Sequence, residues 1–145
     1  MELITVSFPG GKRVDARIGA HLVRTDQPAS LGGEDSAPGP FDLFLASLAT
    51  CAGVYALGFC QARGLSTEGL GLTLQATPDP ATGLPSRVRL ELSLPEGFPE
   101  RYRPAILRAA EGCKVKKTLQ TQPPIEVALA PPERAREEGA PRVVA

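Results

Sequence analysis

Six segments of the chain alternate apolar with polar residues, which is the period-two pattern of a strand with one buried face. They cover residues 2–8, 13–18, 20–25, 70–76, 87–94 and 125–130. Glycine and proline residues separate neighbouring segments, as in Pro9-Gly10-Gly11, and indicate antiparallel hairpins. Because only one face of each strand is apolar, we expect antiparallel sheets that helices cover on one side.

The segment between Asp42 and Arg63 contains no charged residue, although 22% of the chain is charged. Its apolar residues fall on every side of a helical projection, so the pattern predicts a long helix that is buried all round. A membrane span needs about 20 apolar residues, but Ser47, Thr50 and Gln61 dilute this segment, and the strands on both sides give it a core to enter. We therefore interpret it as the central helix of a soluble domain.

Residues 99–110 have the spacing of an amphipathic helix with Ile106 and Leu107 directed inward, and residues 113–120 form a second short helical run. The element order predicts one α+β domain over residues 1–130, and residues 131–145 are expected to form a mobile C-terminal tail. Each sheet can cover only one side of the central helix. A second copy of the chain is the simplest candidate to cover the rest.

The composition argues against several classes of function. The 145 residues include 16 basic and 16 acidic side chains. The net charge therefore gives no reason to expect binding to nucleic acid or to an anionic membrane. The chain does not open with a basic region and an apolar block, so we expect a cytoplasmic protein. Three cysteines without a CxxC pair argue against a disulfide framework or a zinc finger, and the single histidine, His21, argues against a His-rich metal site. No metal or cofactor is expected.

The three cysteines differ in what their positions allow. Cys51 and Cys60 are nine residues apart on the long helix, which places them on opposite faces and roughly 13 Å apart along the axis. They are too far apart for a disulfide, so Cys60 is expected to be a small core residue. Nothing in the spacing prevents Cys51 from meeting Cys113. The sequence around Cys113 favours a lowered pKa more than the sequence around Cys51 does, because Cys113 starts a helix and three lysines follow it.

Arg24 is the candidate cation for the Cys51 thiolate. It shares a strand face with the apolar Ala20 and Leu22, so it is expected to point toward the core, where a charge requires a partner. The alternative is an ion pair at the surface with Asp26, Glu34 or Asp35, and the sequence leaves both open. His21 lies on the opposite strand face, which makes a Cys–His hydrolase a poor interpretation. Asp42 is expected to cap the long helix.

Two segments resemble motifs of the OsmC/Ohr family, the osmotically inducible protein C and organic hydroperoxide resistance proteins. Residues 38–59, PGPFDLFLASLATCAGVYALGF, are similar to the family's first cysteine motif, which opens a long central helix. Residues 111–120, EGCKVKKTLQ, are similar to its second, in which Lys-Thr-Leu follows the cysteine. The resemblance covers about residues 2–130 and implies an OsmC-like α+β fold, antiparallel sheets packed around the buried helix, in an intertwined homodimer.

The resemblance also implies a thiol-dependent peroxidase of the oxidative stress response that reduces organic hydroperoxides. By that likeness Cys51 would be the peroxidatic thiolate, Cys113 would resolve its sulfenic acid as a disulfide, and an external dithiol would reduce the disulfide. Arg24 matches the arginine that stabilises the thiolate in the OsmC branch. In the best-characterised members a glutamate that holds this arginine lies ten residues before the first cysteine, where this chain has Phe41, and Asp42 is one position further on.

A second hypothesis is a non-catalytic dimer that binds a small apolar ligand, with the cysteines as core residues. Phe41 at the position of the carboxylate favours this hypothesis. Oxidation of the protein separates the two, because only a two-cysteine peroxidase predicts a Cys51–Cys113 disulfide.

Overall fold

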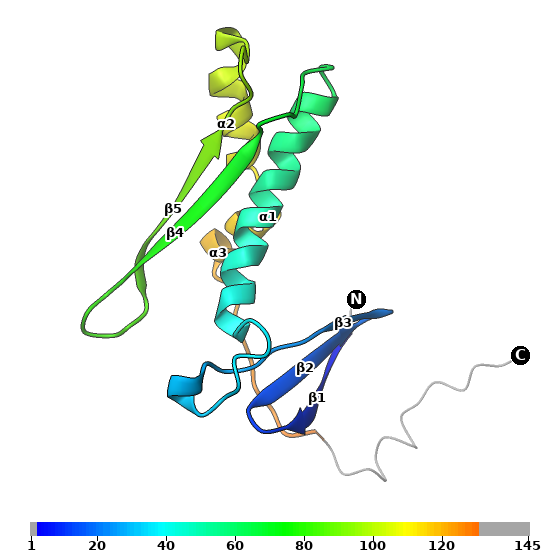
Figure 1. Ribbon diagram of the computed structural model, residues 1–145, viewed down its shortest axis with the longest axis vertical. Coiled ribbons are helices and arrows are strands. Elements are labelled where there is room, and N and C mark those ends of the chain that lie inside the picture. Colours follow the sequence, from blue (N-terminus) through cyan, green and yellow to red (C-terminus); the bar gives the residue numbers. More distant parts are fainter. Residues whose placement is uncertain (1–2, 131–145) are drawn as a thin grey trace, which may run out of the picture.

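The computed structural model describes residues 3–130 and has the predicted α+β architecture (Figure 1). One antiparallel sheet lies along the long helix α1, which spans Pro40–Gln61, and a second lies beyond its N-terminal end (Figure 1). The other elements are β1 (Ile4–Gly10), β2 (Arg13–Ile18), β3 (His21–Val23), η1 (Ala29–Leu31), β4 (Gly71–Pro78), β5 (Pro85–Ser93), η2 (Glu100–Tyr102), α2 (Arg103–Glu111) and α3 (Lys114–Thr121). The tail predicted for residues 131–145 lies outside the described residues.

The first sheet has the strand order β1-β2-β3 and lies beyond the N-terminal end of α1, apart from β4, β5 and α2 (Figure 1). Its antiparallel register pairs Val6 with Ala16 and Arg17 with Leu22. The apolar face predicted for β1 is present, but Ile4, Val6 and Phe8 are all more than half exposed. No layer formed by residues 3–130 therefore covers this face of the sheet.

The second sheet is the hairpin of β4 and β5, which packs with α2 and α3 on the same part of α1. Leu72 pairs with Leu92 and Leu74 with Leu90, so the apolar residues of both strands share the face that meets the helices. Two buried clusters result. One centres on Phe59, Cys60, Phe98 and Ile106, and the other on Leu48, Ala52 and Cys113.

The long helix starts with Pro40, whose missing N–H costs nothing at this position. The Asp42 carboxylate accepts a hydrogen bond from the Gly39 N–H at 2.9 Å, which confirms its capping role. Residues at spacings of three and four form its buried side: Leu48, Ala52, Ala56, Phe59 and Cys60. One chain alone does not bury the helix all round, because the side with Val54, Tyr55 and Leu57 is open to solvent, and covering of this side by a second copy stays a prediction.

This helix is long and apolar enough to cross a membrane by length and composition alone, with 28% of its most apolar window buried. Its buried face packs against the apolar faces of β4 and β5 and against α2, as a core helix does in an α+β domain.

Two further expectations are corrected. Residues 125–130 form no strand within the described chain, and Ile125, Val127 and Leu129 are at least 90% exposed. The alternation is real, but the segment runs from α3 toward the first sheet without a strand of its own chain pairing with it (Figure 1). Leu107 is 53% exposed rather than inward, because α2 buries Ile106 and turns Leu107 toward the rim of a cavity.

The loop between β3 and α1 is organised by one buried carboxylate. Asp26 is 1% exposed and its Oδ2 accepts hydrogen bonds from the Ser36 hydroxyl at 2.6 Å and from the backbone N–H groups of Ser36 and Glu34. Gly33 passes so close to the loop's start that a Cβ there would lie 1.8 Å from the Gln27 carbonyl oxygen. The loop therefore fixes the path of the chain from β3 into α1.

These hydrogen bonds, the Ser36 hydroxyl first, lower the pKa of Asp26 from 3.8 to about 2. A carboxyl whose folded pKa is depressed stabilises the fold fully above its unfolded pKa and loses that contribution as the pH falls through 4 toward 2. We expect Ser36→Ala to lower the melting temperature at pH 7 by about 3–6 °C. The difference from wild type should shrink as the pH falls to 2, as measured by circular dichroism; a difference independent of pH would contradict this account.

Candidate functional site

Cys51 and Cys113 come together where the middle of α1 meets the start of α3. Cys113 is 1% exposed and belongs to the buried cluster with Leu48 and Ala52, and Cys51 is half-buried and packs against the same cluster. The Cys113 thiol lies close enough to the Cys51 sulfur to lower the pKa of the Cys51 thiol. The pairing that the cysteine spacing permitted is therefore present in one chain.

The start of α3 stabilises negative charge on the Cys51 sulfur. The backbone N–H of Val115 contributes most to a lowered pKa of the Cys51 thiol, and partial burial opposes it. The Cys113 thiol, the Lys114 N–H and the Lys114 ammonium lower the pKa further. These groups act together because the first N–H groups of a helix have no carbonyl partner and point out of its N-terminus.

Cys113 occupies the N-cap of the same helix. Its extended backbone precedes Lys114, and its Sγ accepts a hydrogen bond from the Lys116 N–H at 3.3 Å. Cys113 thus caps α3, while the backbone N–H groups of Lys114 and Val115, next to the cap, act on the Cys51 sulfur. The N-terminus of α3 therefore favours the thiolate of Cys51.

The pKa of the Cys51 thiol is lowered although its own sequence neighbours carry no charge. The three lysines follow Cys113 in the chain. The backbone N–H groups at the start of their helix, those of Lys114 and Val115, act on Cys51 in α1. The sequence therefore identified the helix terminus that acts on a thiol, but gave no sign that it acts on Cys51. Val115 and Lys114, acting through their backbone amides, are functional positions that the side-chain pattern could not reveal.

Cys60 is a core residue, as predicted. It is fully buried in the cluster with Phe59 and Ile106, away from the cluster that holds Cys113. Burial raises the pKa of its thiol, and the nearby Arg63 guanidinium offsets only part of this effect. Cys60 is therefore protonated and without access to solvent.

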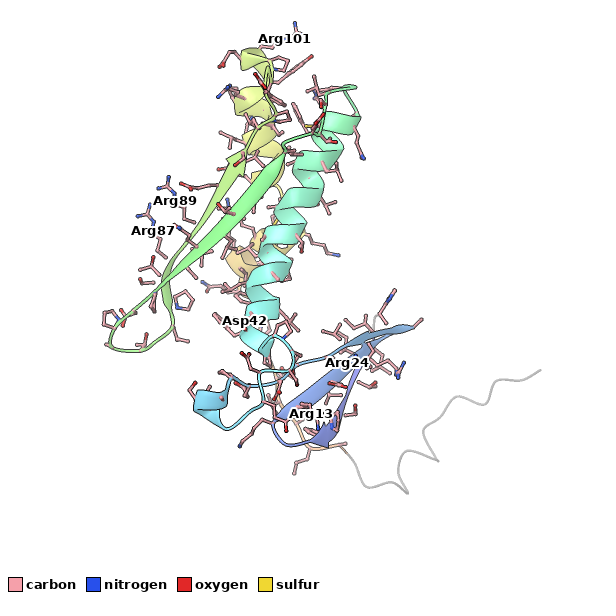
Figure 2. All side chains as sticks on the ribbon, in the orientation of Figure 1. Arg13, Arg24, Asp42, Arg87, Arg89 and Arg101 are labelled. Atoms are coloured by element: carbon pink, nitrogen blue, oxygen red, sulfur yellow. The ribbon has the colours of Figure 1, made fainter. Side chains whose placement is uncertain are left out.

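Arg24 is not brought to the cysteines within one chain. It is exposed at the end of β3 and lies with the first sheet, beyond the start of α1 (Figure 2). It does not contribute to the lowered pKa of Cys51. The surface ion pair is not formed either, because the ion pairs of residues 3–130 are Arg89–Glu91 and Arg103–Glu100. Phe41 stacks on Phe44 with ring centroids 5.5 Å apart and supplies no carboxylate.

A cavity of about 340 Å³ lies beside Cys113, between the inner face of β5 and the helices. Its walls are mostly apolar, with charged residues among them: Leu48, Ala52, Leu72, Arg87, Val88, Arg89, Leu90, Leu92, Leu107, Ala110, Glu111, Cys113 and Lys116. Within the residues described, no group of three or more histidine, cysteine, aspartate or glutamate side chains could hold a metal ion.

The fold and site define a class: an α+β protein in which a half-buried thiol on a central helix meets a second thiol at the N-cap of a short helix. The family model described as OsmC-like protein matches residues 33–128. The chain belongs to the OsmC-like protein family, which confirms the resemblance seen in its cysteine motifs. The comparison with curated proteins found no match.

Solved structures share the fold. An osmotic stress induced and detoxification response protein from Psychrobacter arcticus is 21% identical, with a TM-score of 0.70 and coverage of 81% of this chain and 88% of its own. An organic hydroperoxide resistance protein OsmC from Legionella pneumophila is 20% identical, with a TM-score of 0.55 and coverage of 83% and 89%. An OsmC like protein from Mycoplasma pneumoniae is 19% identical, with a TM-score of 0.58 and coverage of 83% and 87%.

The lowered pKa of Cys51 can be tested by following its alkylation with iodoacetamide as a function of pH. We expect a midpoint below 9.0 in the wild-type protein, because α3 and Cys113 stabilise the thiolate and raise its fraction at neutral pH. Lys114→Ala should move the midpoint upward, since it removes the ammonium. Lys117→Ala removes an exposed lysine of the same helix that does not act on Cys51 and serves as the matched control. Equal shifts in the two variants would contradict the assignment.

Proposed function

We propose that the protein is a thiol-dependent peroxidase that reduces organic hydroperoxides in the cytoplasm as part of the oxidative stress response. The observation that carries the proposal is the packing of Cys51, whose pKa is lowered, against the buried cluster that contains Cys113. The Legionella relative, whose name refers to organic hydroperoxide resistance and to a redox protein, supports the same chemistry. The apolar side chains around the cysteines suit an organic rather than a small polar peroxide.

The reaction would proceed in three steps. The Cys51 thiolate attacks the terminal oxygen of the hydroperoxide, the O–O bond breaks, and the alcohol leaves with a proton, so that Cys51 becomes a sulfenic acid. The Cys113 sulfur attacks the sulfenic sulfur, forms the disulfide and releases water. An external dithiol then reduces the disulfide and is itself oxidised.

A homodimer is part of the proposal. One chain leaves apolar surface exposed on the first sheet, on the open side of α1 and along residues 125–130. A second copy that covered this surface would bury it and would give residues 125–130 a strand to pair with. In such a dimer Arg24 of one chain would reach the cysteines of the other and help to stabilise the Cys51 thiolate. The single domain predicted over residues 1–130 would then fold as half of a two-chain unit.

The deciding assay follows hydroperoxide consumption with dithiothreitol as reductant and compares cumene hydroperoxide with hydrogen peroxide. We expect faster consumption of the organic peroxide. Mass spectrometry of the protein treated with one equivalent of peroxide should find a Cys51–Cys113 disulfide and an unmodified Cys60. Absence of both turnover and this disulfide would overturn the proposal.

The cavity beside Cys113 favours a second candidate function, binding of a small apolar ligand by a non-catalytic dimer. Its volume lies within the range of small-molecule sites. This function predicts saturable binding of an apolar fluorescent probe that competes with added apolar compounds, together with unoxidised cysteines after peroxide treatment.

A further inference from the structure

The cavity beside Cys113 reaches one of the two cysteines and not the other. Cys113 forms part of its wall, whereas Cys51 does not line it. The cavity lies next to β5, which pairs only with β4 in the described chain and so leaves its outer edge free. Because Cys113 is 1% exposed, only a small molecule that enters this cavity can approach its sulfur from that side.

The charged residues of the cavity favour an anion. Arg87 and Lys116 form no ion pair within residues 3–130, whereas Arg89 is paired with Glu91 at 2.7 Å. Glu111 is the one acidic residue of the lining. Arg87 and Arg89 project from β5 on the side away from α1, so they border the opening rather than fill the cavity (Figure 2). A negatively charged molecule would therefore be attracted to the opening and would find apolar walls inside.

We propose that this cavity is the entrance for the reducing thiol, that it prefers a small thiol bearing a negative charge, and that this thiol attacks Cys113 of the Cys51–Cys113 disulfide. The inference rests on the proposed function, since the disulfide forms during peroxide reduction. Peroxide and reductant would then reach the two sulfurs from different sides of α1.

The chemistry balances with two thiol groups, which either one external dithiol or two monothiol molecules supply. The thiolate of the first attacks the Cys113 sulfur, a new S–S bond forms, and the Cys51–Cys113 bond breaks with its electron pair on Cys51. The Cys51 thiolate is a good leaving group, because the amides at the start of α3 stabilise it and a thiol of lower pKa leaves faster. A second thiol attacks the sulfur of the bound reductant and releases Cys113 as a thiolate, which takes up a proton. Two thiols are oxidised to one disulfide.

The site of attack is tested with a disulfide prepared by diamide, which does not depend on peroxidase activity. The oxidised full-length protein is mixed with 2-mercaptoethanesulfonate, quenched with acid before turnover is complete, and alkylated. We expect mass spectrometry to find the mercaptoethanesulfonate adduct on Cys113 and the alkyl group on Cys51. The reverse assignment would overturn the inference and leave the proposed peroxidase activity intact.

The charge preference is tested on the Cys51→Ser variant with two matched reagents, the anionic 2-sulfonatoethyl methanethiosulfonate and the cationic 2-(trimethylammonium)ethyl methanethiosulfonate. Labelling rates of Cys113 are divided by the rates for free cysteine. We expect the normalised rate to favour the anion, and Arg87→Ala and Lys116→Ala each to lower that preference by about threefold at low ionic strength. Arg108→Ala, an exposed arginine of α2 outside the cavity lining, should leave it unchanged. A preference for the cation, or an equal effect of Arg108→Ala, would refute the proposed entrance.

Discussion

Cys51→Ser is expected to reduce the rate of organic hydroperoxide consumption by at least about 100-fold, because a serine hydroxyl is not ionised at neutral pH and is a weak nucleophile. The hydrogen bonds that lower the pKa of Cys51 cannot compensate, since they stabilise a thiolate that is no longer there. The loss should appear in the first turnover and not only in the steady state. The measurement is stopped-flow consumption of cumene hydroperoxide with and without dithiothreitol.

Cys113→Ser and Cys60→Ala complete the series. Without Cys113 the first turnover should still occur, and a sulfenic acid should accumulate on Cys51 that dimedone traps. Cys60→Ala should keep turnover within about twofold of wild type, because Cys60 is fully buried in the other cluster. If Cys51→Ser retained turnover, or if Cys60→Ala lost it to the same degree, the assignment of the peroxidatic cysteine would be wrong.

Val54→Asp is expected to convert the proposed dimer into monomers. Val54 is 64% exposed in one chain, on the open side of α1, so the single chain tolerates a carboxylate there. In the dimer the carboxylate would be buried without a partner, which costs about 3 kcal/mol or more and raises the dissociation constant at least about 100-fold. Analytical ultracentrifugation over a range of concentrations measures the change.

The matched control is Leu84→Asp. Leu84 is 65% exposed and lies in the loop between β4 and β5, away from the surfaces that we expect to associate. This variant should keep the wild-type dissociation constant. A monomeric wild-type protein, or a dimeric Val54→Asp variant, would contradict the assembly and would leave the first sheet without an explanation for its exposed apolar face.

Most strands were predictable because their apolar and polar residues alternate. The alternation in β4 and β5 determines both the type of element and the face that is buried, whereas the uncharged run of α1 determines the type of element and not the buried face. The pairing of Cys51 with Cys113 could be stated only as permitted by spacing, because it depends on how α3 packs against α1. The two cysteine motifs predicted the family, and the match over residues 33–128 confirms it.

The site itself was less predictable, for two physical reasons. The groups that lower the pKa of Cys51 are largely backbone amides, which every residue carries, so no side-chain pattern marks Lys114 or Val115. The position of Arg24 depends on where the first sheet lies, and within residues 3–130 the apolar face of that sheet stays exposed. The strand expected over residues 125–130 does not form for the same reason. Alternation of apolar and polar residues specifies which face of a strand is buried, but it cannot supply the strand that pairs with it.

The separation of the first sheet from the rest of the chain has a consequence for thermodynamics. If its apolar face is covered only by a second chain, the free energy that holds it in place comes from association and varies with protein concentration. No single melting temperature would then describe the protein, because dilution alone would lower it. The hydrogen bonds around Asp26 would persist on dilution, so the loop leading into α1 would keep its shape after the chains had parted.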